Sequence, residues 1–344
     1  MIRGFRNTGK YNLKILIVLS VSAAIYIAAC NTNNNTNSKP LVAPPDTAAV
    51  FVPPDTATIP HDPFGDMVRY GRSLIMNTAY YLGPNGTKGK YLGNKMNCTN
   101  CHAEAGTKPF AFSYFSTHAR YPQYRGRENK ILTVSDRINN CIERPHNGTP
   151  MPLDSKELLA MACYIKWVGA NVPVGKHVKG DDGLELTYPS RPADPGKGVA
   201  IYAENCATCH GKNGEGQFNG DSSTYIYPPL WGMLAYQKGS SPHRVLKDAR
   251  FIKANMPKNK ATWDKPFLTD EQAIDVSAFI NDDRIHPRPE KRNKAIPDYP
   301  EIKVKPIDYG TGPYSDTFSA MQHKFGPYQP IIDYHKKNNL PIIF

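Results

Sequence analysis

The pattern Cys-x-x-Cys-His occurs once in each half of this chain, and no other feature restricts the fold as strongly. In this pattern two thiols bond covalently to the vinyl groups of one haem, and the adjacent imidazole reaches the iron. Each copy therefore needs a fold that wraps around a porphyrin, and the sequence predicts two covalently bound haem c groups. The residues of the two copies are Cys98, Cys101, His102, Cys206, Cys209 and His210.

The first 30 residues are typical of an export signal. A basic start is followed by an apolar run from Ile15 to Ala29, which is too short for a comfortable membrane span, and then by Cys30. Ala28-Ala29-Cys30 resembles a bacterial lipobox, which predicts a lipid on Cys30 that tethers the protein to a membrane; an uncleaved anchor helix is the alternative. Both place the protein in the periplasm. An Asp directly after the lipidated cysteine is a signal for retention in the inner membrane. This chain has Asn31 there, so the outer membrane is the preferred location.

Charge and cysteine content narrow the function further. The formal net charge is +12, and it falls to +8 once the four basic residues of the signal are removed, which suits an acidic partner or an anionic substrate. We predict no nucleic-acid partner, because no motif for one is present. Four of the seven cysteines carry haem and Cys30 carries lipid. Only Cys141 and Cys163 remain, which excludes a disulfide framework unless these two pair.

The chain is organised as a duplication. Residues 31–60 are rich in Asn, Thr and Pro and are predicted to form a disordered tether, whose later part is expected to lie over the first domain. Residues 61–180 and 181–288 each follow the order helix, haem motif, loops and closing helix. Residues 289–344 are rich in Pro, Tyr and Lys and are expected to form an irregular extension. The predicted fold class is mainly α, with two cytochrome c-like domains, each wrapped around a covalently bound haem.

The distal iron ligand of the second haem is expected to be Met256. It lies between the second haem motif and the closing helix that begins near Thr269, and a thioether ligand raises the potential of a haem. Met233 is an alternative ligand, and a lysine is another. The haem motifs themselves give His102 and His210 as the two proximal ligands.

The first domain has no methionine in the equivalent position, because Met151 is followed at once by the closing helix. Cys141 precedes it. If this stretch is helical, Arg137 and Arg144 lie on the same face as Cys141, where they would lower the pKa of the thiol and attract anions. Three alternatives remain open. Cys141 is a buried inert thiol, its arginines pair with acids or haem propionates, or the distal ligand is His118 or His146.

Together these segments resemble the thiosulfate dehydrogenase family of dihaem cytochromes. The resemblance covers most of residues 60–290. It implies that the first haem is ligated by His102 and the Cys141 thiolate, and that two thiosulfate ions are joined there to tetrathionate. It also implies that the second haem passes electrons to a periplasmic cytochrome or another acceptor, and that the reaction can run in reverse. The segments that carry the resemblance are residues 64–71, 97–106, 136–147, 228–232 and 251–257.

The chain departs from the family pattern just after the lone cysteine. Pro145 and Thr149 occupy positions where a serine and a lysine are common. This keeps open a different sulfur substrate at the same kind of haem. A non-catalytic dihaem electron carrier, with Met151 as a ligand, is the alternative function. Candidate substrate-binding arginines, beside the pair near Cys141, are Arg120, Arg125 and Arg127.

Overall fold

The structure is a computed structural model that describes residues 49–290 and 298–344. The predicted signal peptide, the lipidation site at Cys30 and residues 31–48 of the predicted tether lie outside the described residues. The remaining tether residues contact the first domain: the Phe51 ring lies 4.9 Å from the Phe115 ring, and the Phe51 amide donates to the Lys179 carbonyl over 3.1 Å. Within the described ranges, no helix is long and apolar enough to cross a membrane.

The first domain is built around two crossed helices, α2 (Pro63–Met76) and α7 (Lys156–Val168). The Asp62 side chain accepts the Gly65 amide and Pro63 stands in the first turn, which fixes the start of α2. Gly71 lets the two helices approach, because a Cβ there would lie 2.0 Å from the Ala160 carbonyl oxygen. Between them come α3 (Thr78–Leu82), η2 (Cys98–Asn100), α4 (Ala103–Gly106), α5 (Thr117–Arg120), β1 (Gln123–Arg125), β2 (Lys130–Leu132) and α6 (Val134–Glu143).

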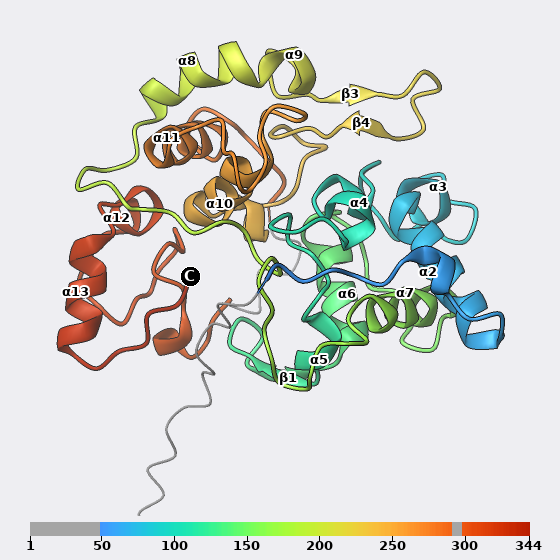
Figure 1. Cartoon of the computed structure of the whole chain (residues 1–344). Coiled ribbons are helices and arrows are strands. Elements are labelled where there is room, and N and C mark those ends of the chain that lie inside the picture. The colour runs from blue at the N-terminus through green and yellow to red at the C-terminus, as the bar shows by residue number, and fades with distance from the viewer. Residues whose placement is uncertain (1–48, 291–297) are drawn as a thin grey trace, which may run out of the picture. The chain divides into compact units, whose positions relative to one another are not determined.

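The second domain repeats this plan with α8 (Pro195–Asn205) against α11 (Asp270–Ile280) (Figure 1). Gly198 has the role of Gly71, since a Cβ there would lie 2.3 Å from the Asp275 carbonyl oxygen. A reciprocal capping box between Thr269 and Gln272 starts α11, as the sequence predicts. The other elements are α9 (Ala207–His210), β3 (Gln217–Phe218), β4 (Tyr225–Tyr227), η3 (Ser241–His243) and α10 (Val245–Asn255).

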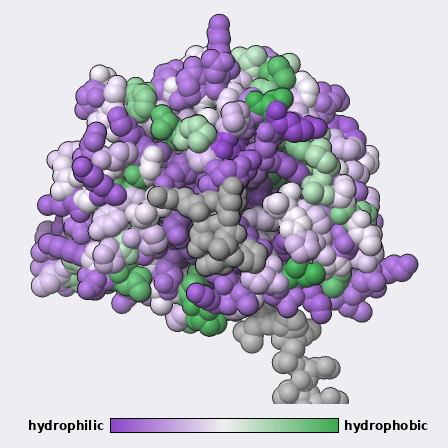
Figure 2. Space-filling model, turned by 180° about the vertical axis from the view of Figure 1, so that it is seen from behind, coloured by the Kyte–Doolittle hydropathy of each residue, from purple (hydrophilic) through white to green (hydrophobic). Residues whose placement is uncertain are grey.

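Strands are a minor part of the fold. β1 and β2 form an antiparallel hairpin in which Tyr124 faces Ile131, and β3 and β4 form another with an irregular register at Gln217 and Phe218. The described chain is therefore mainly helical, as the sequence predicts. Hydrophilic residues cover most of the face in Figure 2, where apolar side chains gather only in small groups.

The C-terminal segment contains more regular structure than its composition indicates. It includes η4 (Ile302–Val304) and two short helices, α12 (Ala320–Phe325) and α13 (Gln329–Lys337). Its apolar side chains, including Phe325, Tyr328 and Ile331, join the core of the second domain. The buried Asp316 carboxylate accepts from Nε2 of both His323 and His335, each over 2.9 Å, which fastens the two helices together.

Candidate haem sites and their surroundings

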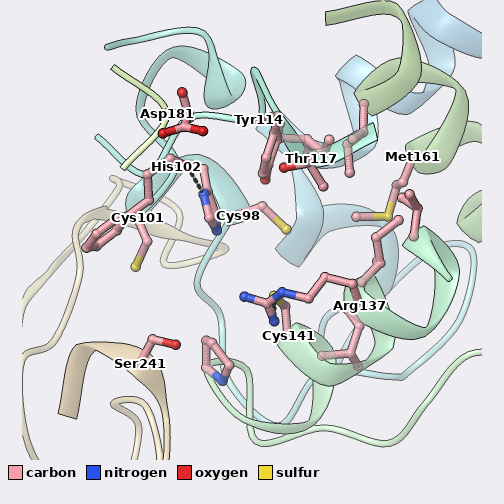
Figure 3. A pocket seen from close by; sticks show the side chains of 18 of the residues that line it. Cys98, Cys101, His102, Tyr114, Thr117, Arg137, Cys141, Met161, Asp181 and Ser241 are labelled. Atoms are coloured by element: carbon pink, nitrogen blue, oxygen red, sulfur yellow. Dashed lines mark hydrogen bonds between the residues drawn. The ribbon is translucent and has the colours of Figure 1, made fainter. Parts of the chain in front are cut away.

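A cavity of about 290 Å³ lies in the first domain, beside the first Cys-x-x-Cys-His motif. Cys98, Cys101 and His102 line one side of it. Arg137 and Cys141, both from α6, face them across the cavity (Figure 3). The donor set of this cavity is therefore two thiols that can bond to a porphyrin, with an imidazole and a third thiol that can reach its iron.

His102 is oriented by the backbone. Its Nδ1 donates to the carbonyl oxygen of Phe112 over 2.5 Å, and its ring lies 4.7 Å from that of Tyr114. A proton held on Nδ1 leaves Nε2 unprotonated in the neutral imidazole, which is the atom that binds a metal. The second domain repeats this contact, because His210 Nδ1 donates to the Pro228 carbonyl over 2.8 Å. Both histidines are thus prepared to bind iron through Nε2.

Cys141 lies near the end of α6, which begins with a capping box between Thr133 and Asp136. Arg137, one turn earlier, places Nη1 3.3 Å from the Cys141 Sγ. Burial opposes ionisation of this thiol, but the charge of Arg137, the contact with His102 and the charge of Arg144 together lower its pKa to about 6. Cys141 is therefore a thiolate at neutral pH, which is the form that binds metals and attacks sulfur.

The five candidate arginines occupy different surroundings. Among the described residues, Arg120, Arg125 and Arg137 line the cavity, whereas Arg127 and Arg144 do not. Arg144 caps the end of α6 and forms an ion pair with Glu128 at 2.9 Å. Arg127 donates to the Gly239 carbonyl, and its guanidinium lies 5.4 Å from the centres of the Tyr299 and Tyr309 rings. The first three arginines are thus placed to contact a ligand inside the cavity, whereas Arg144 acts on the cavity through its charge on Cys141.

The alternative ligands of the first haem are placed as follows. His146 is buried and lines the cavity, with Nε2 3.7 Å from Cys98 Sγ, and burial lowers its pKa to about 4. Met151 is buried in the domain core, its backbone held by Asn139, and it is absent from the described cavity lining. His118 and Cys163 also lie outside that lining. Pro145, where the family pattern is broken, is part of it.

Sequence reasoning missed several cavity residues. Met161 on α7 points its sulfur into the cavity (Figure 3), although its spacing is that of an ordinary core residue. Ser241 and Lys247 belong to the second domain, and Lys247 is paired with Asp182. No local signal could have assigned these residues to the first haem, because their place depends on how the two domains pack.

The second motif faces a more apolar environment. Met256 caps the end of α10 and packs, with Cys206 and Leu230, against the cluster that contains Trp231. Met233, the alternative ligand, is 68% exposed. Met256 is therefore the better placed of the two methionines to reach an iron in the core of this domain.

A buried carboxyl group lies near both haem motifs. Asp248 on α10 is close enough to Cys101 and to Cys206 for its charge to act on each. Burial raises the pKa of Asp248 to about 7, although Ser277 and Asn281 both donate to its carboxylate over 3.0 Å. The two attachment motifs are thus neighbours of one acidic group on α10.

Comparison with known proteins agrees with this arrangement. A family model described as SoxA/TsdA, cytochrome c domain, matches residues 88–174, and the cytochrome c model matches residues 196–282. These two domains bear out the predicted fold class and imply two covalently bound haem c groups. The motif cysteines are free of disulfide bonds, and both motif histidines hold Nδ1 against a carbonyl, so the residues present fit the group.

Relatives of known name support the same assignment. The thiosulfate dehydrogenase of Stutzerimonas stutzeri is 35% identical over 240 residues, which cover 70% of this chain and 73% of that protein. That of Allochromatium vinosum is 34% identical over 249 residues, or 71% of this chain and 86% of that protein.

The solved thiosulfate dehydrogenase TsdBA from Marichromatium purpuratum matches the fold with a TM-score of 0.62 at 33% identity. The match covers 68% of this chain and 49% of that one, so the chain spans about half the length of the solved protein. By its two cytochrome c domains and these relatives, the chain belongs to the thiosulfate dehydrogenase family.

Proposed function

We propose that the protein joins two thiosulfate ions into tetrathionate at the first haem and passes the two electrons out through the second. The observation that carries this proposal is the pairing of Cys141 with Arg137 at 3.3 Å, opposite His102 in the cavity. An electron carrier needs no ionised thiol inside its haem cavity. A sulfur-coupling enzyme does, because a thiolate is the nucleophile that forms and exchanges sulfur–sulfur bonds.

The cavity has the charge that such a substrate needs. Thiosulfate is a dianion, and bringing two of them together costs Coulomb repulsion. Arg120, Arg125 and Arg137 each contribute a positive charge to the cavity lining. Buried or partly buried guanidinium groups are weakly hydrated and bind oxyanions in a forked geometry, so they offset this repulsion.

The thiolate lets the coupling proceed in two steps. In the first, a sulfur–sulfur bond forms between Cys141 and the sulfane sulfur of one thiosulfate, and two electrons are released. In the second, the sulfane sulfur of another thiosulfate attacks that sulfur, which forms tetrathionate and releases the Cys141 thiolate. No proton is consumed and no electron is lost in the second step. The same steps in reverse, supplied with two electrons, reduce tetrathionate.

The ligand assignment follows from the same residues. His102 and Cys141 would hold the first haem iron, and His210 and Met256 the second. The Cys141 thiolate would leave the iron when it reacts with thiosulfate. The two haems would supply one-electron acceptors, and a cysteine thiolate ligand would give the first the lower potential. Met256 favours the reduced state of the second haem, so electrons are expected to move from the first site to the second. From there they leave to a periplasmic cytochrome or another external acceptor.

We propose further that the protein acts outside the cytoplasm, where covalent haem attachment is completed. The lipobox-like sequence ending at Cys30 supports attachment to a membrane through a lipid on that residue. The outer membrane is preferred because Asn31 follows the cysteine.

The test is the Cys141→Ala variant, with Cys163→Ala as a matched control. Both residues are partly exposed cysteines on helices of the first domain that carry no haem. We expect Cys141→Ala to lose tetrathionate formation while keeping both haems, and Cys163→Ala to keep wild-type turnover. Wild-type turnover by fully haem-loaded Cys141→Ala would refute the role of the thiolate, because tetrathionate would then form without a cysteine adduct.

A further inference from the structure

A short segment of the first domain, residues 110–112, lies against the end of α10 in the second. The Phe110 ring stacks on Trp263 with centres 5.0 Å apart, and the Phe112 ring stacks on Phe251 at 5.4 Å. Between these stacks, Asn255 Nδ2 donates to the Phe110 carbonyl oxygen over 3.0 Å. The segment is therefore held to the second domain by these two ring stacks, by the Lys247 ammonium 5.1 Å from the centre of the Phe112 ring, and by one buried hydrogen bond.

The same segment also orients the proximal histidine of the first haem. The Phe112 carbonyl accepts from His102 Nδ1. Phe110 and Phe112 both have positive φ values, 57° and 50°, which side-chain-bearing residues rarely adopt. Such a backbone persists only where its surroundings hold it. The position of the carbonyl that orients His102 thus depends on contacts made by the second domain, together with the Gly180 carbonyl of the first, which accepts the Phe110 amide over 2.8 Å.

At the other end, Asn255 is the last residue of α10 and precedes Met256. Its side chain is 3% exposed. Besides Phe110, Nδ2 donates to the Phe251 carbonyl over 3.0 Å, and the Met256 amide donates to the Ile252 carbonyl over 2.8 Å. Both neighbours of Nδ2 are carbonyl oxygens, which fixes the orientation of the amide. Asn255 therefore ties the first-domain segment to the turn that presents Met256.

We propose that Asn255 is a positioning residue that couples the two haem sites, by joining the backbone that orients His102 to the turn that presents Met256. The link runs from His102 through Phe112 and Phe110 to Asn255 and on to Met256. It rests on the proposed role of Met256 as an iron ligand. Because coupling between two sites is reciprocal, a change at either end is felt at the other.

The coupling has a direction at each haem. A hydrogen bond from His102 Nδ1 to a carbonyl makes the imidazole a stronger donor to ferric iron and holds the first potential down. A fixed position of Met256 keeps the reduction potential of the second haem high. Loss of the Asn255 link weakens both effects, so the first potential rises, the second falls, and the gap between them narrows.

The experiment is a redox titration of the holoprotein without thiosulfate, comparing wild type with Asn255→Ala. The matched control is Asn205→Ala. Asn205 is the last residue of α8 and precedes Cys206. Its Nδ2 donates to the carbonyl four residues earlier, that of Ile201, over 3.2 Å, which is a bond within its own domain. We expect the two potentials to converge in Asn255→Ala and to keep their wild-type separation in Asn205→Ala.

The absorption band of methionine-ligated ferric haem gives a second readout. Asn255→Ala removes one buried hydrogen bond. We expect this loss to lower the ratio of methionine-ligated to unligated second haem about five- to tenfold. If that variant fails to take up haem, Trp263→Leu loosens the same segment from the other side. This substitution leaves the residues beside Met256 unaltered, and the reduction potential of the first haem should still rise.

The outcomes separate this proposal from the ligand assignment. A second-haem spectrum that is unchanged in Met256→Ala refutes the ligand assignment and this coupling with it. A spectrum that changes in Met256→Ala, together with wild-type potentials in Asn255→Ala, refutes the coupling alone. Neither readout depends on turnover of thiosulfate.

Discussion

At the scale of single residues, Cys141 and Cys163 show how surroundings decide what a thiol can do. Burial raises the pKa of Cys163, and the charge of Lys166 only partly offsets this. Burial acts on Cys141 in the same direction, but Arg137 and His102 outweigh it and bring the pKa to about 6. Two cysteines on helices of one domain therefore differ in pKa: that of Cys141 is lowered and that of Cys163 is raised.

The Arg137→Gln variant tests whether the charge beside Cys141 serves the substrate. A charge-assisted hydrogen bond is worth roughly 1.5–3 kcal/mol, so we expect kcat/KM for thiosulfate to fall about ten- to hundredfold. Arg144→Gln is the comparison, because Arg144 pairs with Glu128 outside the cavity lining. Its effect should be smaller at equal haem content. Equal losses in the two variants would count against a direct role for Arg137.

The sequence could predict part of this site. The spacing of Arg137 and Arg144 around Cys141 follows from helical periodicity, and a helix is found there. The same spacing could not reveal that Glu128, from the loop before β2, pairs with Arg144. Helical spacing also could not predict that Lys247 lines the cavity, because its position there depends on a contact between the two domains.

At the scale of elements, each domain depends on one close helix crossing. Gly71 on α2 faces the Ala160 backbone of α7, and Gly198 on α8 faces the Asp275 backbone of α11. A side chain at either glycine would collide with backbone atoms of the facing helix, which cannot move aside as the end of a flexible side chain can. The duplication seen in the sequence thus extends to the contact that sets the distance between the two main helices of each domain.

Gly71→Ala is expected to destabilise the holoprotein by about 1–3 kcal/mol, because overpacking forces α2 and α7 apart. Gly220→Ala is the control, since a Cβ there meets nothing within 4 Å. Denaturant unfolding of both variants gives the comparison. Equal stability of the two would show that the crossing tolerates a methyl group.

Helices with strong terminal signals were predictable, and elements without them were not. Thr269 and Gln272 predict the start of α11, where the structure has a capping box. Ser155 precedes α7, although its side chain makes no capping hydrogen bond there. In the C-terminal segment a similar signal exists, since Ser319 accepts the Gln322 amide at the start of α12. The many prolines and tyrosines around it hide that signal, because the apolar period is too short to stand out.

At the scale of the whole described chain, the two domains are not independent units. The first haem cavity takes Ser241 and Lys247 from the second domain, and Asn255 bonds to the first. The C-terminal segment completes the second domain with Phe325 and with the buried ion pair between Arg244 and Asp308. Sequence periodicity gives the duplication but not these contacts, because side chains from distant segments meet only after folding.

The coupling of thiosulfate to tetrathionate is tested by the stoichiometry of thiosulfate oxidation by the purified, fully haem-loaded chain with a one-electron acceptor such as ferricyanide. Thiosulfate, tetrathionate and reduced acceptor are measured in one sample. We predict that two thiosulfates disappear for each tetrathionate formed and that two electrons reach the acceptor. Acceptor reduction with sulfate as the product, or no tetrathionate at full haem content in either direction, would contradict the account.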